Sequence, residues 1–161
     1  MKTKVIALLA VFLVAPACAS APPEGGGVRS ISYETGPCFG ACPVYRVVVN
    51  VDGSGRFEGR RFTAVEGQRG FAVTPGQWRA FVARLAPYRP SGAEAIGPGH
   101  PRCQMQATDH PSATVTWSGA GGEDRLAFYY GCRDAENAAL ARALREAPGL
   151  LPIGDLIGPN R

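Results

Sequence analysis

Val44-Tyr-Arg-Val-Val-Val-Asn-Val51 is the strongest strand signal in the chain, and the turn Asp52-Gly-Ser-Gly55 follows it directly. Valine-rich runs favour β-strands, and Asp-Gly pairs accept the positive φ angles that tight hairpin turns need. The partner strand is expected over 56–63, although its apolar residues alternate poorly. A β-hairpin is therefore the predicted centre of the fold.

Further strands are expected on both sides of this hairpin. Residues 28–34 alternate between apolar and polar types and predict a first strand. Residues 113–117 and 125–130 predict a second hairpin around the turn Gly119-Ala-Gly-Gly122. Residues 91–111 are rich in glycine and proline, and they predict a long irregular loop.

Two helices are predicted by caps and by apolar spacing. Thr74 is placed to cap a helix that begins at Pro75. Its apolar residues recur every three or four positions, which forms one stripe; they are Trp78, Phe81, Val82 and Leu85. The second helix is expected from Asp134 to Glu146, with four residues facing inward: Ala138, Leu140, Ala141 and Leu144.

Together these elements predict an α+β domain. We expect an antiparallel sheet of about five strands with two helices on one face, in which a hairpin–helix unit occurs twice. The apolar tail from 150 to 157 is expected to pack on this domain.

The N-terminus has the pattern of a bacterial export signal. Lys2 and Lys4 precede an apolar run over 5–14, and small residues follow around Cys18. The run is about half of the ~20 residues that cross a bilayer as a helix. We expect a signal peptide over 1–18, a flexible tether over 19–27 and one domain over 28–161.

Two cleavage sites compete at this signal. Ala17-Cys18 resembles a lipobox, in which Cys18 becomes the lipidated N-terminus, and Ala19 then resembles an outer-membrane sorting residue. An Ala-x-Ala site would instead release a soluble periplasmic protein. We favour the outer-membrane lipoprotein facing the periplasm, held to the membrane by a lipid anchor only.

The charge pattern gives no sign of a nucleic-acid partner. The formal net charge is +4, and two of the positive charges, Lys2 and Lys4, leave with the signal. Every other basic residue apart from the two histidines is an arginine, and the arginines are scattered among acidic residues. No nucleic-acid motif accompanies them.

The cysteines suggest two disulfide bonds. Lipidation of Cys18 would leave an even set of four for an oxidising compartment, namely Cys38, Cys42, Cys103 and Cys132. The second hairpin brings the start of its first strand beside the end of its second, which favours a Cys103–Cys132 bond. A Cys38–Cys42 bond would then close a small loop, and the crossed pairings stay open.

The segment Cys38-Phe-Gly-Ala-Cys-Pro-Val-Tyr45, followed by its Asp-Gly turn, resembles the signature of bacterial domain-of-unknown-function family 6438. Thr108-Asp-His-Pro111 and Tyr130-Gly-Cys132 resemble the second half of that family. The resemblance covers roughly residues 30–144. It implies secreted or lipid-anchored bacterial proteins, and it implies no activity.

A metal or redox site is one alternative. Cys38-x-x-x-Cys42-Pro43 is similar to the copper-binding and redox motif of Sco-type proteins, and His110 or His100 would complete a Cys/Cys/His set. Reactive thiols usually lie at a helix N-terminus, whereas this motif leads directly into a strand. A structural disulfide is therefore favoured.

A hydrolase using Asp109 and His110 is the second alternative. No Gly-x-Ser-x-Gly or His-Glu-x-x-His motif accompanies the pair, and a loop turn is favoured. Four tyrosines on neighbouring strands would either line a binding face or pack across strands; they are Tyr33, Tyr45, Tyr129 and Tyr130.

The sequence leaves the function unknown. It favours a non-catalytic, envelope-located domain that binds or scaffolds an unknown envelope partner or ligand, without a cofactor. The alternatives are a periplasmic thiol-redox or copper protein using the Cys38/Cys42 loop with His110, and a hydrolase using Asp109 and His110.

Overall fold

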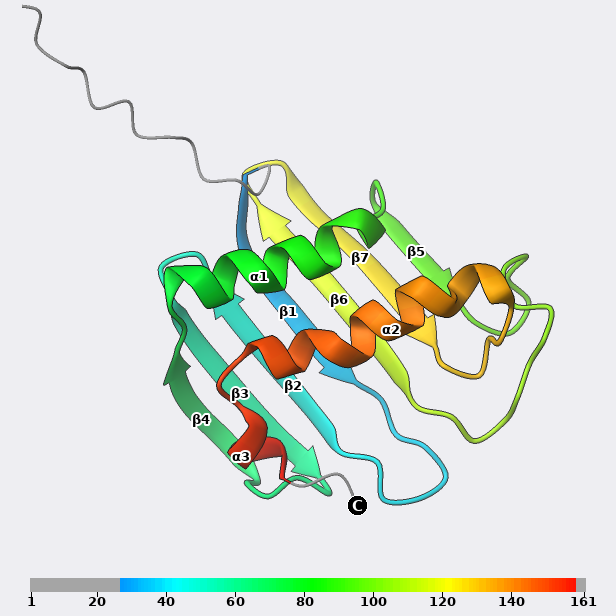
Figure 1. Cartoon of the computed structure of the whole chain (residues 1–161), viewed down its shortest axis with the longest axis horizontal. Coiled ribbons are helices and arrows are strands. Elements are labelled where there is room, and N and C mark those ends of the chain that lie inside the picture. Colours follow the sequence, from blue (N-terminus) through cyan, green and yellow to red (C-terminus); the bar gives the residue numbers. More distant parts are fainter. Residues whose placement is uncertain (1–26, 159–161) are drawn as a thin grey trace, which may run out of the picture.

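The computed structural model describes residues 27–158 (Figure 1). Within this part of the chain seven strands form one mixed sheet, in the order β4-β3-β2-β1-β6-β7-β5. In chain order the strands are β1 (Val28–Thr35), β2 (Val44–Asn50), β3 (Ser54–Arg61), β4 (Gly67–Ala72), β5 (Ala93–Ile96), β6 (Ser112–Gly119) and β7 (Gly122–Tyr129). Neighbouring strands run antiparallel except β5 and β7, which are parallel.

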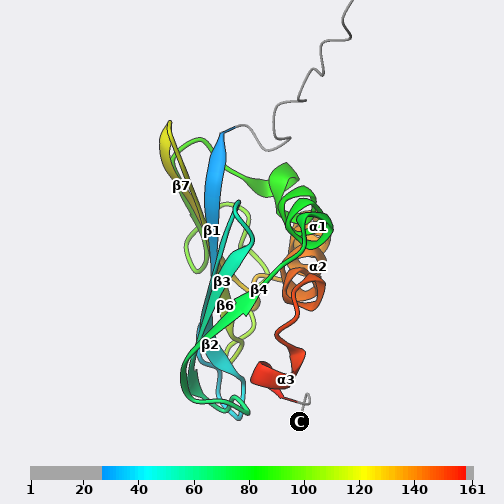
Figure 2. The same cartoon turned by 90° about the vertical axis from the view of Figure 1, so that its left-hand side faces the viewer.

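The helices all lie on one side of this sheet (Figure 2). They are α1 (Pro75–Leu85), α2 (Ala138–Glu146) and the short α3 (Gly154–Ile157). Single 3-10 turns flank them: η1 (Ala86–Tyr88), η2 (Ala135–Asn137) and η3 (Ala147–Leu150). The core lies between the sheet and these helices.

The start of α1 follows from its cap. The Thr74 hydroxyl accepts a hydrogen bond from the Gln77 backbone N–H, and the Gln77 side chain accepts one from the Thr74 N–H. This capping box satisfies two donors that a helix start would otherwise leave unpaired. The predicted apolar stripe of α1 is confirmed, because Trp78, Phe81, Val82 and Leu85 are all buried.

The predicted five-stranded antiparallel sheet with two helices is wrong. The sequence pattern missed β4, an edge strand whose residues are mostly exposed and so lack apolar alternation. It also missed β5, which has four residues inside the glycine- and proline-rich stretch over 91–111. The missed strands also overturn the expected hairpin–helix repeat, since four strands precede α1 and three more lie between α1 and α2.

Asp124 explains how β5 comes to lie parallel to β7. Its carboxylate accepts hydrogen bonds from the Gly92 backbone N–H at 2.7 Å and from Arg89 Nε at 2.6 Å. These two bonds hold the pKa of Asp124 below its usual value. The chain leaving η1 is therefore fixed on the β7 edge, where β5 begins.

The second helix differs from its prediction at the N-terminal end. Residues 135–137 form the 3-10 turn η2, and the Asp134 carboxylate accepts the Met105 N–H instead of capping the helix. Ala138 is exposed, whereas Leu140, Ala143 and Leu144 are buried.

The predicted signal peptide over 1–18, including Cys18, lies outside the described residues, as does the tether up to residue 26. Within residues 27–158 no helix has the length and apolar character needed to cross a membrane.

Candidate functional site

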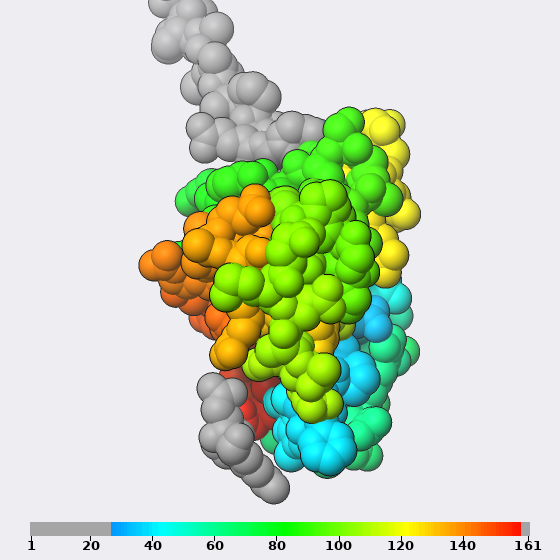
Figure 3. Space-filling model, turned by 90° about the vertical axis from the view of Figure 1, so that its right-hand side faces the viewer, coloured from blue at the N-terminus to red at the C-terminus, as the bar shows by residue number. Residues whose placement is uncertain are grey.

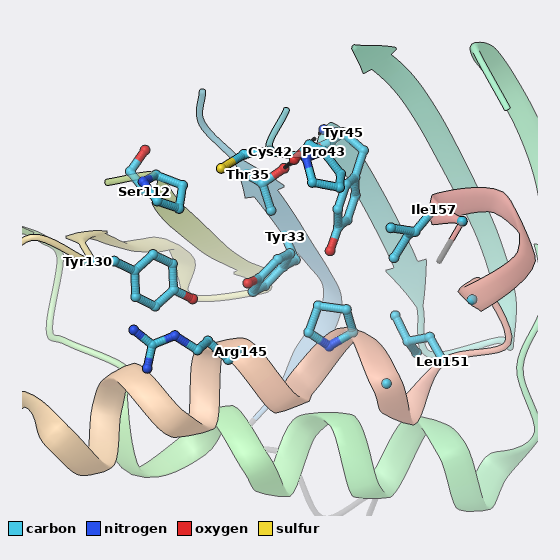
Figure 4. Close-up of a pocket in the computed structure, with 15 residues that line it drawn as sticks. Tyr33, Thr35, Cys42, Pro43, Tyr45, Ser112, Tyr130, Arg145, Leu151 and Ile157 are labelled. Atoms are coloured by element: carbon cyan, nitrogen blue, oxygen red, sulfur yellow. Dashed lines mark hydrogen bonds between the residues drawn. The ribbon is translucent and has the colours of Figure 1, made fainter. Parts of the chain in front are cut away.

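A cavity of about 560 Å³ lies between the sheet and the chain that follows α2 (Figure 4). Its lining comes from the ends of β1, β2 and β6, from α2 and from the C-terminal turns. The lining residues are Tyr33, Thr35, Cys42, Pro43, Tyr45, Pro111, Ser112, Tyr130, Arg145, Pro148, Gly149, Leu151, Gly154, Ile157 and Gly158. Its size is that of ordinary small-molecule sites, which range over roughly 300–1,000 Å³.

Tyr33 lines the sheet side of this cavity and holds α2 in place beside it. Its hydroxyl donates a hydrogen bond to the Leu144 carbonyl at 2.8 Å. In a regular helix that carbonyl would accept the N–H four residues later, but residue 148 is proline and has none. Tyr33 therefore replaces the missing helical donor and ties the last turn of α2 to the centre of the sheet.

Two further tyrosine hydroxyls face the same space. Tyr45 stacks on Phe57, with ring centroids 5.5 Å apart, and among the described residues its hydroxyl has no hydrogen-bond partner. The hydroxyl of Tyr130 lies beside that of Tyr33 (Figure 4). Burial raises the pKa of Tyr33, of Tyr45 and of Tyr130, so all three are neutral donors at ordinary pH.

Among the described residues that line the cavity, Arg145 alone is charged. Its guanidinium stacks over the Tyr130 ring, 4.7 Å from the centroid, and the side chain is exposed to solvent. Among the residues that the structure describes, Arg145 has no ion-pair partner. Because stacking uses the face of the guanidinium, its N–H groups stay free to donate to a ligand.

The opposite end of the cavity is apolar. Leu151 and Ile157 lie there, away from Tyr130 and Arg145 (Figure 4). Two backbone hydrogen bonds hold α3 over this end, from the Ala64 N–H to the Ile157 carbonyl at 3.0 Å and from the Val65 N–H to the Leu156 carbonyl at 3.1 Å.

The Cys38–Cys42 loop borders the cavity. The two cysteines are bonded, and Cys42 is part of the lining. The Thr35 hydroxyl donates to the Pro43 carbonyl at 2.8 Å and accepts the Tyr45 N–H at 3.0 Å, which anchors the end of the loop to β1. At the tip, Phe39 is 88% exposed.

Cys103 and Cys132 form the other disulfide, with Cα atoms 4.7 Å apart. This is the pairing expected from the hairpin geometry, since Cys132 follows the end of β7. The bond ties the loop between β5 and β6 to the end of the hairpin.

The loop that carries Asp109 and His110 lies beside the Cys38–Cys42 loop at the end of the sheet (Figure 3). The Phe39 N–H donates to the Asp109 carbonyl at 3.2 Å, and Asp109 has a φ of 68°. The Asp109 carboxylate accepts the Thr108 hydroxyl, and the His110 N–H donates to the Tyr129 hydroxyl. Neither Asp109 nor His110 lines the cavity.

The remaining histidine lies elsewhere in this loop. His100 Nδ1 accepts the Arg102 backbone N–H at 3.1 Å, and its Nε2 is 4.0 Å from the Glu94 carboxylate. Within residues 27–158 no three His, Cys, Asp or Glu side chains are grouped to hold a metal ion. His110 and the two loop cysteines are therefore not brought together as a three-ligand set in the described chain.

A family model for a domain of unknown function, DUF6438, matches residues 29–151. The chain belongs to this family. The resemblance found in the sequence is thus confirmed, and DUF6438 assigns no function to the chain. The match includes Tyr33, Tyr45, Tyr130 and Arg145 and ends at Leu151, so α3 lies beyond the matched residues. Neither the curated proteins nor the solved structures contain a match to this chain.

Sequence reasoning reached part of this site. Of the four tyrosines considered for a binding face, three line the cavity, whereas Tyr129 points away and donates to the Ala107 carbonyl. Adjacent strand residues face opposite sides, which separates Tyr129 from Tyr130. Arg145 was missed, although it directly follows the inward-facing Leu144.

Proposed function

We propose that this DUF6438 protein is a non-catalytic binding domain of the bacterial envelope and that the cavity is its ligand site. The observation that carries the proposal is the lining itself. Three neutral tyrosine hydroxyls and one unpaired guanidinium converge on a space with an apolar far end. A few placed polar groups within apolar walls are the usual composition of a small-molecule site.

The envelope location rests on three observations. The N-terminus carries the pattern of an export signal, and Cys18 stands where a lipid anchor would be attached. The domain has two disulfide bonds, and such bonds persist in oxidising compartments such as the periplasm. We propose an outer-membrane lipoprotein whose domain faces the periplasm.

The location is tested by the intact mass of protein isolated from its native membrane without reductant, after alkylation of free thiols. We expect a chain that begins at Cys18, carries lipid and has no alkylated cysteine. An unprocessed N-terminus would contradict export. Alkylation at Cys38 and Cys42 would instead favour the thiol or copper alternative, in which that loop reacts.

Binding is tested with N-phenyl-1-naphthylamine, a neutral dye that fluoresces in apolar surroundings. We expect the wild-type domain to bind the dye. Ile157→Trp places a larger side chain in the apolar end and should weaken binding by roughly tenfold, because overfilling a packed space costs about 1–3 kcal/mol.

The matched control is Asp155→Trp, which adds a tryptophan to the same helix α3 at an exposed position outside the lining. It should leave dye binding unchanged. Equal binding by wild type and both variants would show that the dye binds elsewhere, and absence of binding to wild type would contradict the proposed site.

A further inference from the structure

The two ends of the cavity differ in chemistry, and this difference points to a class of ligand. Arg145, Tyr130 and Ser112 lie at one end, whereas Leu151 and Ile157 lie at the other, with Tyr33 and Tyr45 between them (Figure 4). A ligand that fills this space must present a polar group to the first end and an apolar body to the second.

The charge at the polar end is uncompensated. Within residues 27–158 no acidic residue lines the cavity, and Arg145 has no ion-pair partner there. The carboxylate nearest in sequence, on Glu146, is paired with Arg84 on α1. A guanidinium without a counterion favours an anionic ligand, because charge-assisted hydrogen bonds to carboxylates are stronger than neutral ones.

The tyrosine hydroxyl groups of the cavity also favour an anionic ligand, because they are hydrogen-bond donors. Burial raises the pKa of Tyr45 and of Tyr130, so both hydroxyls keep their protons and can donate. The Tyr45 hydroxyl has no acceptor among the described residues. An anion in the cavity would supply acceptors both for this donor and for the free N–H groups of Arg145.

We propose that the ligand is a small amphipathic organic anion, with its acidic group at Arg145 and Tyr130 and its apolar body against Leu151 and Ile157. This inference rests on the proposed function, because it assumes that the cavity is the binding site. It adds the chemical class of the ligand.

The test uses two dyes that share one aromatic skeleton. 8-Anilinonaphthalene-1-sulfonate carries a sulfonate that the neutral N-phenyl-1-naphthylamine lacks. At low ionic strength we expect the folded wild-type domain to bind the anionic dye about tenfold more tightly than the neutral dye. Decanoate should displace the anionic dye, and decanol should do so less effectively.

Arg145→Ala is expected to remove this preference. Binding of the anionic dye should weaken by about tenfold, whereas binding of the neutral dye should weaken by less than about threefold, because only lining surface and no ion pair is lost. Arg145→Lys keeps the charge and should restore part of the preference. The matched control, Arg142→Ala, removes the same charge from the exposed face of α2 outside the cavity and should change neither affinity.

The outcomes separate this inference from the proposed function. If the neutral dye binds and the anionic dye binds no more tightly, the cavity is a ligand site but the ligand class is wrong. If Arg142→Ala weakens the anionic dye as much as Arg145→Ala does, the dye responds to overall charge and the inference is overturned. If neither dye binds, the proposed site fails as well.

Discussion

At the residue scale, the hydroxyl oxygen of Tyr33 has two roles: it holds the end of α2, and it lines the cavity. The tyrosine ring lies in the core of the sheet, and its hydroxyl occupies the position of the helical N–H that Pro148 lacks. The same hydroxyl borders the cavity beside Tyr130. Its hydrogen bond to Leu144 thus links the end of α2, where Arg145 lies, to the strand that carries the back wall.

Tyr33→Phe tests the structural role of this hydroxyl. The change leaves the buried Leu144 carbonyl without its donor, so we expect a loss of about 1 kcal/mol in the free energy of unfolding. Urea unfolding followed by circular dichroism measures it. Tyr88→Phe is the control, because among the described residues the Tyr88 hydroxyl has no hydrogen bond and its loss should cost under about 0.5 kcal/mol. Equal effects of the two changes would show that the Leu144 carbonyl does not depend on Tyr33.

At the element scale, the sequence predicted the elements that bury apolar side chains and missed those that do not. The valine-rich β2 and the apolar stripe of α1 both follow from burial on one face. The edge strand β4 is mostly exposed and β5 buries only Ile96, and both strands take their position from backbone pairing, with β3 and β7 respectively. Such pairing leaves no periodicity in the sequence, so no pattern could have predicted them.

The same reasoning explains what was missed in the site. Tyr33 on β1, Tyr45 on β2 and Tyr130 just after β7 could be recognised because aromatic residues in strand segments stand out. Arg145 could not, since its place at the cavity depends on how α2 crosses the sheet. That crossing is determined by the Tyr33–Leu144 hydrogen bond and by the core packing of α2, which connect residues far apart in the sequence.

At the scale of the whole molecule, the cavity exists because the C-terminal segment crosses one face of the sheet without filling the space between itself and the strands. After α2 the chain turns through Pro148, and α3 is held against the β3–β4 connection by backbone hydrogen bonds. Figure 2 shows α3 on the same side of the sheet as the other helices. The cavity lies between the sheet and this C-terminal segment. The sheet therefore forms one of its walls, and the residues from α2 to α3 form the opposite wall.

The three cavity tyrosines also predict how the fold responds to alkaline pH. Burial raises the pKa of each in the folded state, whereas an exposed tyrosine in the unfolded chain titrates near pH 10. The folded state therefore binds more protons than the unfolded state above about pH 10. The stability linked to these groups is fully present below that pH and is lost as the pH rises through the folded pKa values.

We expect the melting temperature of the wild type to fall steeply above about pH 10. The melting temperature of Tyr45→Phe, which lacks one of the three groups, should fall less steeply. Melting curves from pH 8 to 12, with tyrosinate absorbance at 295 nm, measure both effects. If all five tyrosines ionised near pH 10 while the domain stayed folded, the hydroxyls at the cavity would be in free contact with water, and the polar end of the proposed site would be an open surface instead of a pocket.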